Sequence, residues 1–380
     1  MELRDYREKI DAIDTELLRL FTERMDVAAE IAGYKKEHGL PVLDERREKQ
    51  KLLDIAGRVP EELRDHAVSL YSLFFELSRS RQNRLLGETS ELTERIEAAL
   101  AETNPLFPPT ASVACQGVEG SYQQLACERL FRLPNVLYFS SFDAVFSAIE
   151  RGLCRYGVIP VENSTAGSVN AVYDLMMKHN FYIVRSVRLK IDHNLLVKPG
   201  TRWEDVKEIY SHEQAISQCA GFLQKHPGVK VVICENTAAA AQLVAESPRR
   251  DVAALASRAC MGLYHLEALE EAVQDRDNNH TRFICISRKL EIYPGADRTS
   301  LMLTLPHKPG SLYKLLSRFY ALGINLNKLE SRPLPERNFE FMFYFDLDAS
   351  VYSPEFIRLM AELPGITDSF SYLGSYSEVI

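Results

Sequence analysis

The first 50 residues carry cationic side chains at positions where two of them can close on one small anion. Arg24 and Lys35 belong to a helical pattern over residues 1–37, so they lie within roughly 20° of each other on the helix surface and about 16 Å apart along its axis. Arg7 lies about 25 Å from Arg24 on a different face of that helix. It can share a site with Arg24 only when it comes from a second chain packed antiparallel.

Further polar residues follow at helical spacing on two more predicted helices. They form two sets: Asp44, Arg47 and Glu48 at i, i+3 and i+4, and Ser78 and Gln82 at i and i+4. Each residue alone is most simply explained as part of a solvated helix surface, because surface arginine and lysine are common. The pattern by itself names no reaction.

A resemblance to a known family supplies the reaction. The stretches from Arg7-Glu8-Lys9-Ile10-Asp11 to Glu23-Arg24 and from Tyr34-Lys35-Lys36 to Asp44-Glu45-Arg46-Arg47-Glu48 resemble the all-helical chorismate mutase family. The resemblance implies an intertwined helical dimer, in which an arginine near the start of the first helix reaches across from the other subunit. It implies the substrate-binding residues Arg7, Arg24, Lys35, Asp44, Arg47, Glu48, Ser78 and Gln82.

These residue types suit a Claisen rearrangement, which transfers no proton and needs no nucleophile. Chorismate is a dianion, so its two carboxylates require arginine partners, ideally bidentate ones. Negative charge builds on the ether oxygen as the C–O bond breaks, and Lys35 and Gln82 would donate hydrogen bonds there. Glu48 and Asp44 would hold the ring hydroxyl. Lys35, Gln82 and Glu48 are therefore the catalytic residues that the resemblance implies here.

Five short motifs at predicted strand-to-loop junctions define a second candidate site. They are Gly117–Tyr122, Pro160–Val169, Tyr210–Ala215, Glu235–Ala240 and Asn279–Phe283. Open α/β sheets bind ligands at the loops after strand carboxyl ends, and small hydroxylic residues at helix starts leave backbone N–H groups free for anions. One such motif is explained as well by ordinary caps and turns, but five in register predict a polar, anion-binding cleft.

The motifs Glu162-Asn163-Ser164-x-x-Gly167-x-Val169, Tyr210-Ser211-His212-x-Gln214-Ala215 and Thr281-Arg282-Phe283 resemble prephenate dehydratase. The resemblance implies two lobes, like those of periplasmic binding proteins, with the site between them and Thr281 as its catalytic residue. Val118 and Gln123 depart from the family's first motif, which usually has proline and serine there. The implied cleft residues are Ser121, Glu162, Asn163, Ser164, Thr165, Ser211, Gln214, Thr237, Arg282 and Phe283.

This second reaction expels CO2 and hydroxide from prephenate and leaves an aromatic ring. The enzyme must hold the carboxylates and protonate the departing hydroxyl. A threonine hydroxyl is a poor acid in water, so Thr281 is expected to act as a hydrogen-bond donor or relay. His212 is either an alternative acid or a structural histidine. We expect no metal and no organic cofactor.

Residues 298–380 follow the split βαβ pattern of ferredoxin-like domains. The expected strands cover 300–305, 324–331, 339–347 and 369–376, and the expected helices cover 311–322 and 354–363. Two motifs resemble the ACT regulatory domain of prephenate dehydratases, which binds phenylalanine at a dimer interface, although Ser311 replaces an alanine. The resemblance implies feedback inhibition by L-phenylalanine through Gly310, Ser311, Leu312, Glu330, Ser331, Arg332 and Pro333.

The expected domains are an all-α segment at 1–87, a linker at 88–110 that is partly helical at its start, a two-lobed α/β domain at 111–290 and an α+β domain at 298–380. The all-α segment holds helices over 1–37, from Asp44 to 57, and from Pro60. Two short helices cannot cover the apolar stripe of the long one, so a homodimer is expected. The α/β domain is expected to hold a mainly parallel sheet, with strands at 112–115, 156–160, 207–211, 230–234, 252–255 and 282–286.

Composition fits a globular chain of two or three domains, with 380 residues, 46% of them hydrophobic and 26% charged. The net charge of -8 argues against nucleic acid as a main partner. Seven scattered cysteines without a CxxC pair indicate reduced thiols in the cytoplasm. The sequence shows neither an apolar leader nor a bilayer-length run, so no membrane partner is expected.

The three resemblances together predict a bifunctional chorismate mutase–prephenate dehydratase. Two alternatives stay open. One is a dehydratase whose helical part is a degenerate dimerisation domain. The other is a non-catalytic amino-acid-sensing protein, because two-lobed and ACT folds both bind ligands without chemistry.

Overall fold

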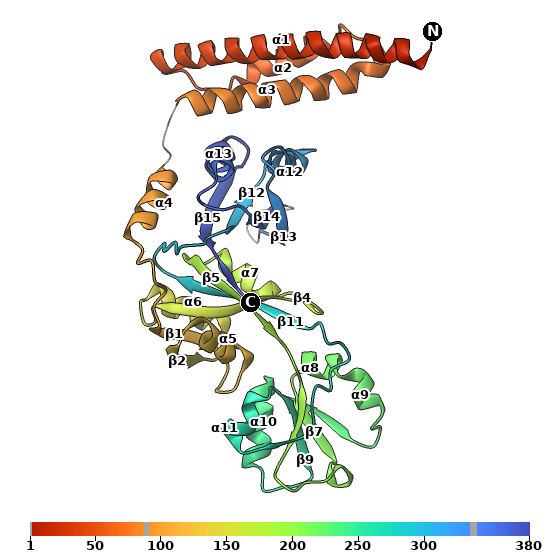
Figure 1. Cartoon of the computed structure of the whole chain (residues 1–380), viewed down its shortest axis with the longest axis vertical. Coiled ribbons are helices and arrows are strands. Elements are labelled where there is room, and N and C mark those ends of the chain that lie inside the picture. The colour runs from red at the N-terminus through yellow and green to blue at the C-terminus, as the bar shows by residue number, and fades with distance from the viewer. Residues whose placement is uncertain (1, 87–90, 335–339) are drawn as a thin grey trace. The chain divides into compact units, whose positions relative to one another are not determined.

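The computed structural model describes residues 2–86, 91–334 and 340–380 (Figure 1). The first residues of the expected linker, 88–90, lie outside the described residues. The chain divides into two compact units, Met1–Glu94 with Ile357–Ile366 and Arg95–Phe356 with Thr367–Ile380. None of the described helices is long and apolar enough to cross a membrane.

The helical unit contains the three predicted helices, α1 (Leu3–Glu37), α2 (Glu45–Ala56) and α3 (Arg64–Leu86), the last preceded by a short 3-10 turn, Glu61–Leu63. Asp44 caps α2, because its carboxylate accepts a hydrogen bond from the backbone N–H of Arg47 at 2.9 Å. Both α1 and α2 pack against α3. Met25 and Ala28 are buried on α1, whereas the apolar side chain of Ile13 is 55% exposed.

A further helix, α4 (Glu91–Glu102), lies within the segment expected to be a linker. Ile96 and Ala99 are buried on its apolar side. The expected helical start of this segment is confirmed, and α4 forms there because its acidic sequence carries an apolar stripe.

The first lobe of the second unit is built on a seven-stranded sheet in the order β16-β5-β11-β3-β1-β2, with β4 beside β3. The helices α5 (Tyr122–Leu130), α6 (Phe142–Glu150) and α7 (Asn170–Met176) pack on it. The strands are β1 (Thr110–Gln116), β2 (Leu133–Phe139), β3 (Tyr156–Asn163), β4 (Gly167–Ser168), β5 (Tyr182–Lys190), β11 (His280–Ser287) and β16 (Glu378–Val379).

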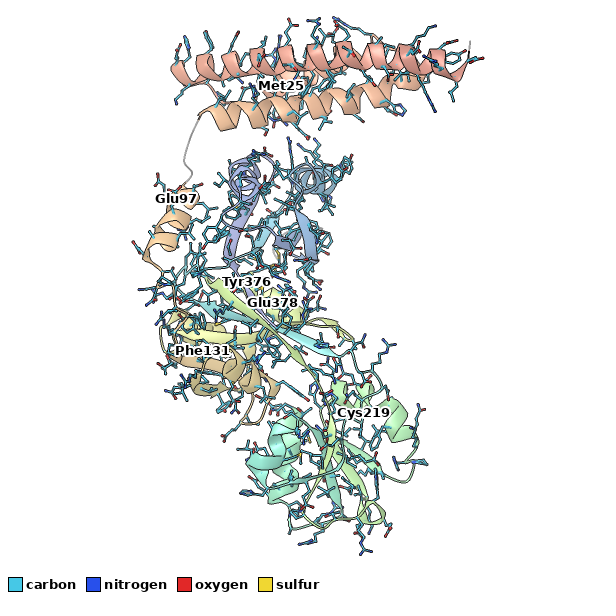
Figure 2. All side chains as sticks on the ribbon, in the orientation of Figure 1. Met25, Glu97, Phe131, Cys219, Tyr376 and Glu378 are labelled. Carbon is cyan, nitrogen blue, oxygen red and sulfur yellow. The ribbon has the colours of Figure 1, made fainter. Side chains whose placement is uncertain are left out.

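The second lobe is built on a five-stranded sheet in the order β10-β6-β9-β7-β8. Its strands are β6 (Asn194–Val197), β7 (Glu208–Ser211), β8 (Lys230–Ile233), β9 (Val252–Ala256) and β10 (Glu267–Glu270). Its helices are α8 (Glu213–Gln218), α9 (Ala220–Gln224), α10 (Thr237–Glu246) and α11 (Ala259–Tyr264). Met25, Phe131 and Cys219 mark the buried cores of the helical unit and of the two lobes (Figure 2).

The expectation of a mainly parallel sheet is wrong, because both sheets are mixed. β1 lies parallel to β2 and β3, but β11 lies antiparallel to β3 and β5. In the second lobe β6 lies antiparallel to β9 and β10. The chain leaves the first lobe after β5 and returns in β11, and this exchange of strands between lobes is a tertiary event that short apolar runs do not reveal.

The C-terminal domain confirms the predicted βαββαβ order. Its four strands form an antiparallel sheet in the order β13-β14-β12-β15. After β15 the chain continues into β16, which pairs in parallel with β5 of the first lobe. The elements are β12 (Arg298–Thr304), α12 (Ser311–Ala321), β13 (Asn325–Pro333), β14 (Phe341–Asp348), α13 (Pro354–Glu362) and β15 (Ser369–Tyr376).

Candidate active sites

The helical unit contains a cavity of about 450 Å³ between α1, α2 and α3. It is lined by seven of the eight residues predicted for this segment. Arg7 is the eighth, and it lies toward the exposed start of α1, away from this lining. The seven are Arg24, Lys35, Asp44, Arg47, Glu48, Ser78 and Gln82.

Arg24 and Lys35 are both held by backbone carbonyls at the cavity wall. Arg24 donates to the Phe74 carbonyl at 2.9 Å and to the Ser78 hydroxyl, and its guanidinium lies 5.4 Å from the centre of the Phe74 ring. Burial lowers the pKa of Arg24, although an arginine remains charged at neutral pH. Lys35 donates to the Val42 carbonyl at 2.6 Å. These contacts fix both cations before a ligand arrives.

The remaining polar groups in this cavity differ in how much of their bonding capacity is used. Glu48 pairs with Arg79, which the sequence reasoning missed. The side chain of Gln82 is 6% exposed, and its Oε1 accepts no hydrogen bond from any described residue. A buried, unpaired amide oxygen is costly, so the Gln82 oxygen is left to accept a hydrogen bond from a ligand. Lys51 was also missed, although it follows Arg47 at i+4.

The second site is a cleft of about 390 Å³ whose lining comes from both lobes. Six of the predicted residues line it. They are Ser121, Asn163, Gln214, Thr237, Thr281 and Phe283.

Hydrogen bonding determines the direction in which the Thr281 hydroxyl donates. The backbone N–H groups of Thr165 and Ala166 donate to Asn163 Oδ1 at 3.0 and 2.9 Å. The other amide atom of Asn163 is therefore the NH2 group, which donates to Thr281 Oγ1 at 2.9 Å and to Asn279 Oδ1 at 2.7 Å. Because Thr281 Oγ1 accepts this bond, its own proton is free to donate to a ligand in the cleft.

The same reasoning carries on through two more amides to a histidine. Asn279 uses its NH2 group to donate to Gln218 Oε1 at 2.9 Å. His193 Nε2 lies 3.0 Å from that same oxygen, so Nε2 must carry a proton. Burial lowers the pKa of His193, so the ring is neutral. Asn279 belongs to a predicted motif, but Gln218 and His193 were missed by the sequence reasoning, because three segments distant in sequence meet only in the fold.

Three helix starts converge on this cleft. Ser121, His212 and Asn236 cap α5, α8 and α10, and each accepts a hydrogen bond from a backbone N–H of its own helix. All three line the cleft. Helix N-termini attract anions through their free N–H groups and the helix dipole. Among the described residues that line the cleft, none is a lysine or an arginine.

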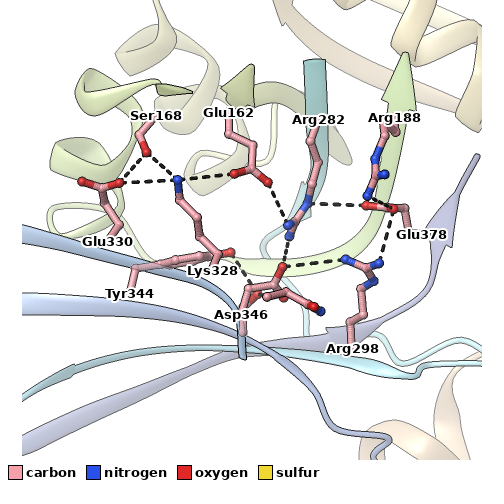
Figure 3. Close-up of polar contacts among 12 residues, drawn as sticks. Glu162, Ser168, Arg188, Arg282, Arg298, Lys328, Glu330, Tyr344, Asp346 and Glu378 are labelled. Atoms are coloured by element: carbon pink, nitrogen blue, oxygen red, sulfur yellow. Dashed lines mark hydrogen bonds and ion pairs between the residues drawn. The ribbon is translucent and has the colours of Figure 1, made fainter. Parts of the chain in front are cut away.

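Two residues expected in the cleft face away from it. Asn163 and Thr281 pair across β3 and β11, and their neighbours Glu162 and Arg282 pair at the next position. Successive side chains on a strand point to opposite faces, so Glu162 and Arg282 point toward the C-terminal domain (Figure 3). Their placement in the cleft is corrected for this reason.

Three further residues also lie outside the cleft lining. Ser211 is fully buried, and its hydroxyl donates to the Leu255 carbonyl at 2.8 Å. The Ser164 hydroxyl donates to the Asn278 carbonyl at 2.8 Å. Thr165 lines a neighbouring pocket of about 360 Å³. These hydroxyls shape the loops that carry Asn163 and Gln214 rather than the cleft surface itself.

The two motifs expected to bind an effector differ in the contacts that their residues make. Gly310 precedes α12 with φ 83, a left-handed conformation that favours glycine. In the second motif, Glu330 contacts Ser168, and Arg332 forms two bonds to Asp174 at 2.7 and 2.8 Å. The side chains of Glu330 and Arg332 therefore bind the first lobe in this structure.

Comparison with known proteins matches both sites. Residues 6–83 match the family model of chorismate mutase type II, and residues 113–291 match that of prephenate dehydratase. The bifunctional chorismate mutase/prephenate dehydratase of Escherichia coli K12 is 33% identical over 97% of this chain and 95% of its own.

Solved structures match 70% of this chain. A prephenate dehydratase from Arthrobacter aurescens in complex with L-Phe is 27% identical with a TM-score of 0.65, over 70% of this chain and 90% of that one. A protein described as a novel type of quorum-quenching acylase is 30% identical with a TM-score of 0.64, over 70% of this chain and 98% of that one. The near-complete match to the bifunctional enzyme shows that this chain belongs to the bifunctional chorismate mutase/prephenate dehydratases.

Proposed function

We propose that the helical cavity rearranges chorismate to prephenate with the residues that line it. Arg24 and Arg47 bind the two carboxylates, with Arg7 of a second chain closing the site. Lys35 and Gln82 donate to the ether oxygen, where negative charge develops. Seven residues that the chemistry requires meet in one cavity, which argues against a degenerate helical domain.

In the cleft, Thr281 donates a hydrogen bond from its hydroxyl to the departing ring hydroxyl of prephenate, and the hydroxide that leaves takes its proton from solvent. The single observation that carries this role is the bond from the Asn163 amide, which leaves the Thr281 proton free. The helix starts at Ser121, His212 and Asn236 hold the carboxylates. His212 Nδ1 accepts from the Gln214 N–H at 3.3 Å, so a neutral His212 presents an Nε2 proton as a second donor.

The lack of a cation in the cleft lining suits a decarboxylation. A carboxylate that leaves as CO2 loses its charge in the transition state. An ion pair to that carboxylate would therefore stabilise the bound substrate more than the transition state, and would slow the reaction. Backbone N–H groups hold the same carboxylate more weakly.

The surface of α1 supports a homodimer as part of the proposal. Ile10, Ile13 and Leu17 repeat along one stripe and are 56%, 55% and 53% exposed. A second copy packed antiparallel along this stripe would bury it and bring its Arg7 to the cavity. We also place the enzyme in the cytoplasm, where its seven free cysteines stay reduced.

Feedback inhibition by L-phenylalanine is the regulatory part of the proposal. It is supported by the ferredoxin-like C-terminal domain and by the similar dehydratase that is in complex with L-Phe. The regions at Gly310–Leu312 and Glu330–Pro333 are the proposed effector site.

One coupled assay tests the whole proposal. Purified chain is given chorismate, and phenylpyruvate is measured with and without millimolar L-phenylalanine. The proposal expects phenylpyruvate to form and phenylalanine to suppress it. Prephenate that accumulates without phenylpyruvate would refute the dehydratase, and no consumption of chorismate would refute the mutase.

A further inference from the structure

The strands β3 and β11, which present Asn163 and Thr281 to the cleft, also present side chains on the opposite face of the sheet. β3 and β11 pair Asn163 with Thr281 and, at the next position, Glu162 with Arg282. The first pair faces the cleft through the 2.9 Å bond between Asn163 and Thr281. The second pair faces the C-terminal domain through an ion pair at 3.2 Å. Because the two pairs are adjacent on the same strands, a shift of one pair moves the other.

Arg282 is buried against groups that belong to the C-terminal domain and its tail. Its side chain is 5% exposed and forms an ion pair with Asp346 of β14, which is fully buried (Figure 3). It also donates to the Tyr376 hydroxyl of β15 at 3.0 Å and lies 3.6 Å from Glu378 of β16. Arg282 thus connects β11, the strand that carries Thr281, to β14, β15 and β16.

The other end of this interface is held by β13. Lys328 lies 3.3 Å from Glu162 and donates to the Ser168 hydroxyl at 2.6 Å. Ser168 belongs to β4 and pairs there with Glu162. Glu330, within the proposed effector motif, contacts Ser168 as well. The strand that carries the effector motif therefore contacts Glu162, the ion-pair partner of Arg282 behind the catalytic residues.

The positive and negative charges in this interface nearly balance. Each charged side chain is therefore held by partners of opposite sign and cannot shift without leaving one of them unpaired. Arg188 and Arg298 lie 2.8 and 3.4 Å from Glu378, and Arg298 lies 4.0 Å from Asp346. A buried ion pair adds little net stability, but removing one partner leaves an uncompensated buried charge. Such a cluster is suited to fixing a position.

We propose that Asp346 is a positioning residue of the dehydratase. Acting through Arg282, Asp346 holds the β3–β11 pairing that presents Asn163 and Thr281 to the cleft. Through the same contact, phenylalanine binding at the C-terminal domain changes the position of Asn163 and Thr281 in the cleft. This second part rests on the proposed phenylalanine response.

The variant Asp346→Asn, made in the full chain, tests this role. The account expects kcat for prephenate to fall about tenfold with KM within about twofold. It expects the phenylalanine concentration for half inhibition to rise about tenfold, while calorimetry still detects phenylalanine binding. The mutase rate of the same preparation should not change, and the retained KM and phenylalanine binding show that the second unit is folded.

Two further variants separate positioning from loss of stability. Glu291→Gln is a matched control, because it removes a mostly buried carboxylate that pairs with Arg155 and Tyr156 and, among the described residues, forms no ion pair or hydrogen bond with Arg282. It should lower the melting temperature and leave kcat and inhibition unchanged. A double-mutant cycle with Arg282→Met and Asp346→Leu should show non-additive effects on kcat, because the two residues act as one unit.

Each outcome decides one part. Wild-type kcat and wild-type inhibition in Asp346→Asn would overturn the proposal, as would additive effects in the cycle. An equal fall of kcat in Glu291→Gln would show a purely structural effect and would also overturn it. If the unaltered chain does not bind phenylalanine, the regulatory part of the proposed function fails, and the kcat and KM values of Asp346→Asn still decide the positioning role.

Discussion

The helical cavity and the inter-lobe cleft handle the same dianion, since prephenate is the product of the first and the substrate of the second. The cavity is lined by the cationic side chains of Arg24, Lys35, Arg47, Lys51 and Arg79. The polar lining of the cleft consists mainly of amides, hydroxyls and helix starts, and no described lysine or arginine lines it.

The difference follows from what each reaction does to charge. The rearrangement keeps both carboxylates intact and builds negative charge on an oxygen, so fixed cations stabilise its transition state. The dehydration destroys one carboxylate charge and needs a proton donor at a hydroxyl, so strong cations would favour the substrate over the transition state. Two sites that bind the same molecule can thus differ in their lining, with cationic side chains in the cavity and no described lysine or arginine in the cleft.

The largest expected effect is at the hydrogen-bond donor of the cleft, Thr281. Thr281→Val removes the free hydroxyl and keeps the shape, and we expect dehydratase kcat to fall about 1000-fold. Thr281→Ser restores a donor at the same place and should recover most of the rate. Mutase turnover of the same samples is the control. A Thr281→Val chain with the wild-type dehydratase rate would remove Thr281 from the mechanism.

The next effect is at the cavity and tests the use of a fixed cation there. Lys35→Ala should lower mutase turnover by more than about 100-fold, the scale for losing one donor to a developing negative charge. Its dehydratase rate with added prephenate should stay normal. Near-normal mutase turnover would show that Lys35 does not stabilise the ether oxygen.

A cation introduced into the cleft sharpens the comparison. Gln214 is exposed in the first turn of α8 and lines the cleft. We expect Gln214→Lys to lower KM for prephenate and to lower kcat about tenfold, equal to about 1.4 kcal/mol of added ground-state stabilisation. Gln214→Met is the matched uncharged control. A rise of kcat in Gln214→Lys would contradict the explanation for the cation-free lining.

The smallest effect concerns stability against pH. Burial lowers the pKa of His193 in the folded chain, so below its ordinary pKa of about 6.5 the unfolded chain binds a proton that the folded chain does not. Stability of the second unit should therefore decrease as pH falls below about 6.5. In His193→Gln this part of the decrease should disappear in thermal melts between about pH 5 and 7. An unchanged pH dependence would mean that the folded chain protonates the neutral His193 ring as readily as the unfolded chain does.

The sequence predicted the elements that depend on local pattern. The helices at 1–37 and from Asp44, the strand at 369–376 and the βαββαβ order all follow from periodicity and caps, which act over a few residues. The cavity residues were found because a helical face is determined by spacing alone.

The parts that were missed depend on distant contacts. Arg282 was placed in the cleft because its motif contains Thr281, but strand alternation sends adjacent side chains to opposite faces. The strand-pairing partner on its own face, Glu162, was misplaced for the same reason. Gln218 and His193 could not be found, because the amide chain that joins them to Asn279 closes only when both lobes are present.

The most direct test of the central claim is a crystal structure of the Thr281→Val chain with prephenate in the cleft. The account predicts that the carboxylates contact backbone N–H groups at the starts of α5, α8 and α10, and that Arg282 stays paired with Asp346. A lysine or arginine side chain bound to either carboxylate would contradict it.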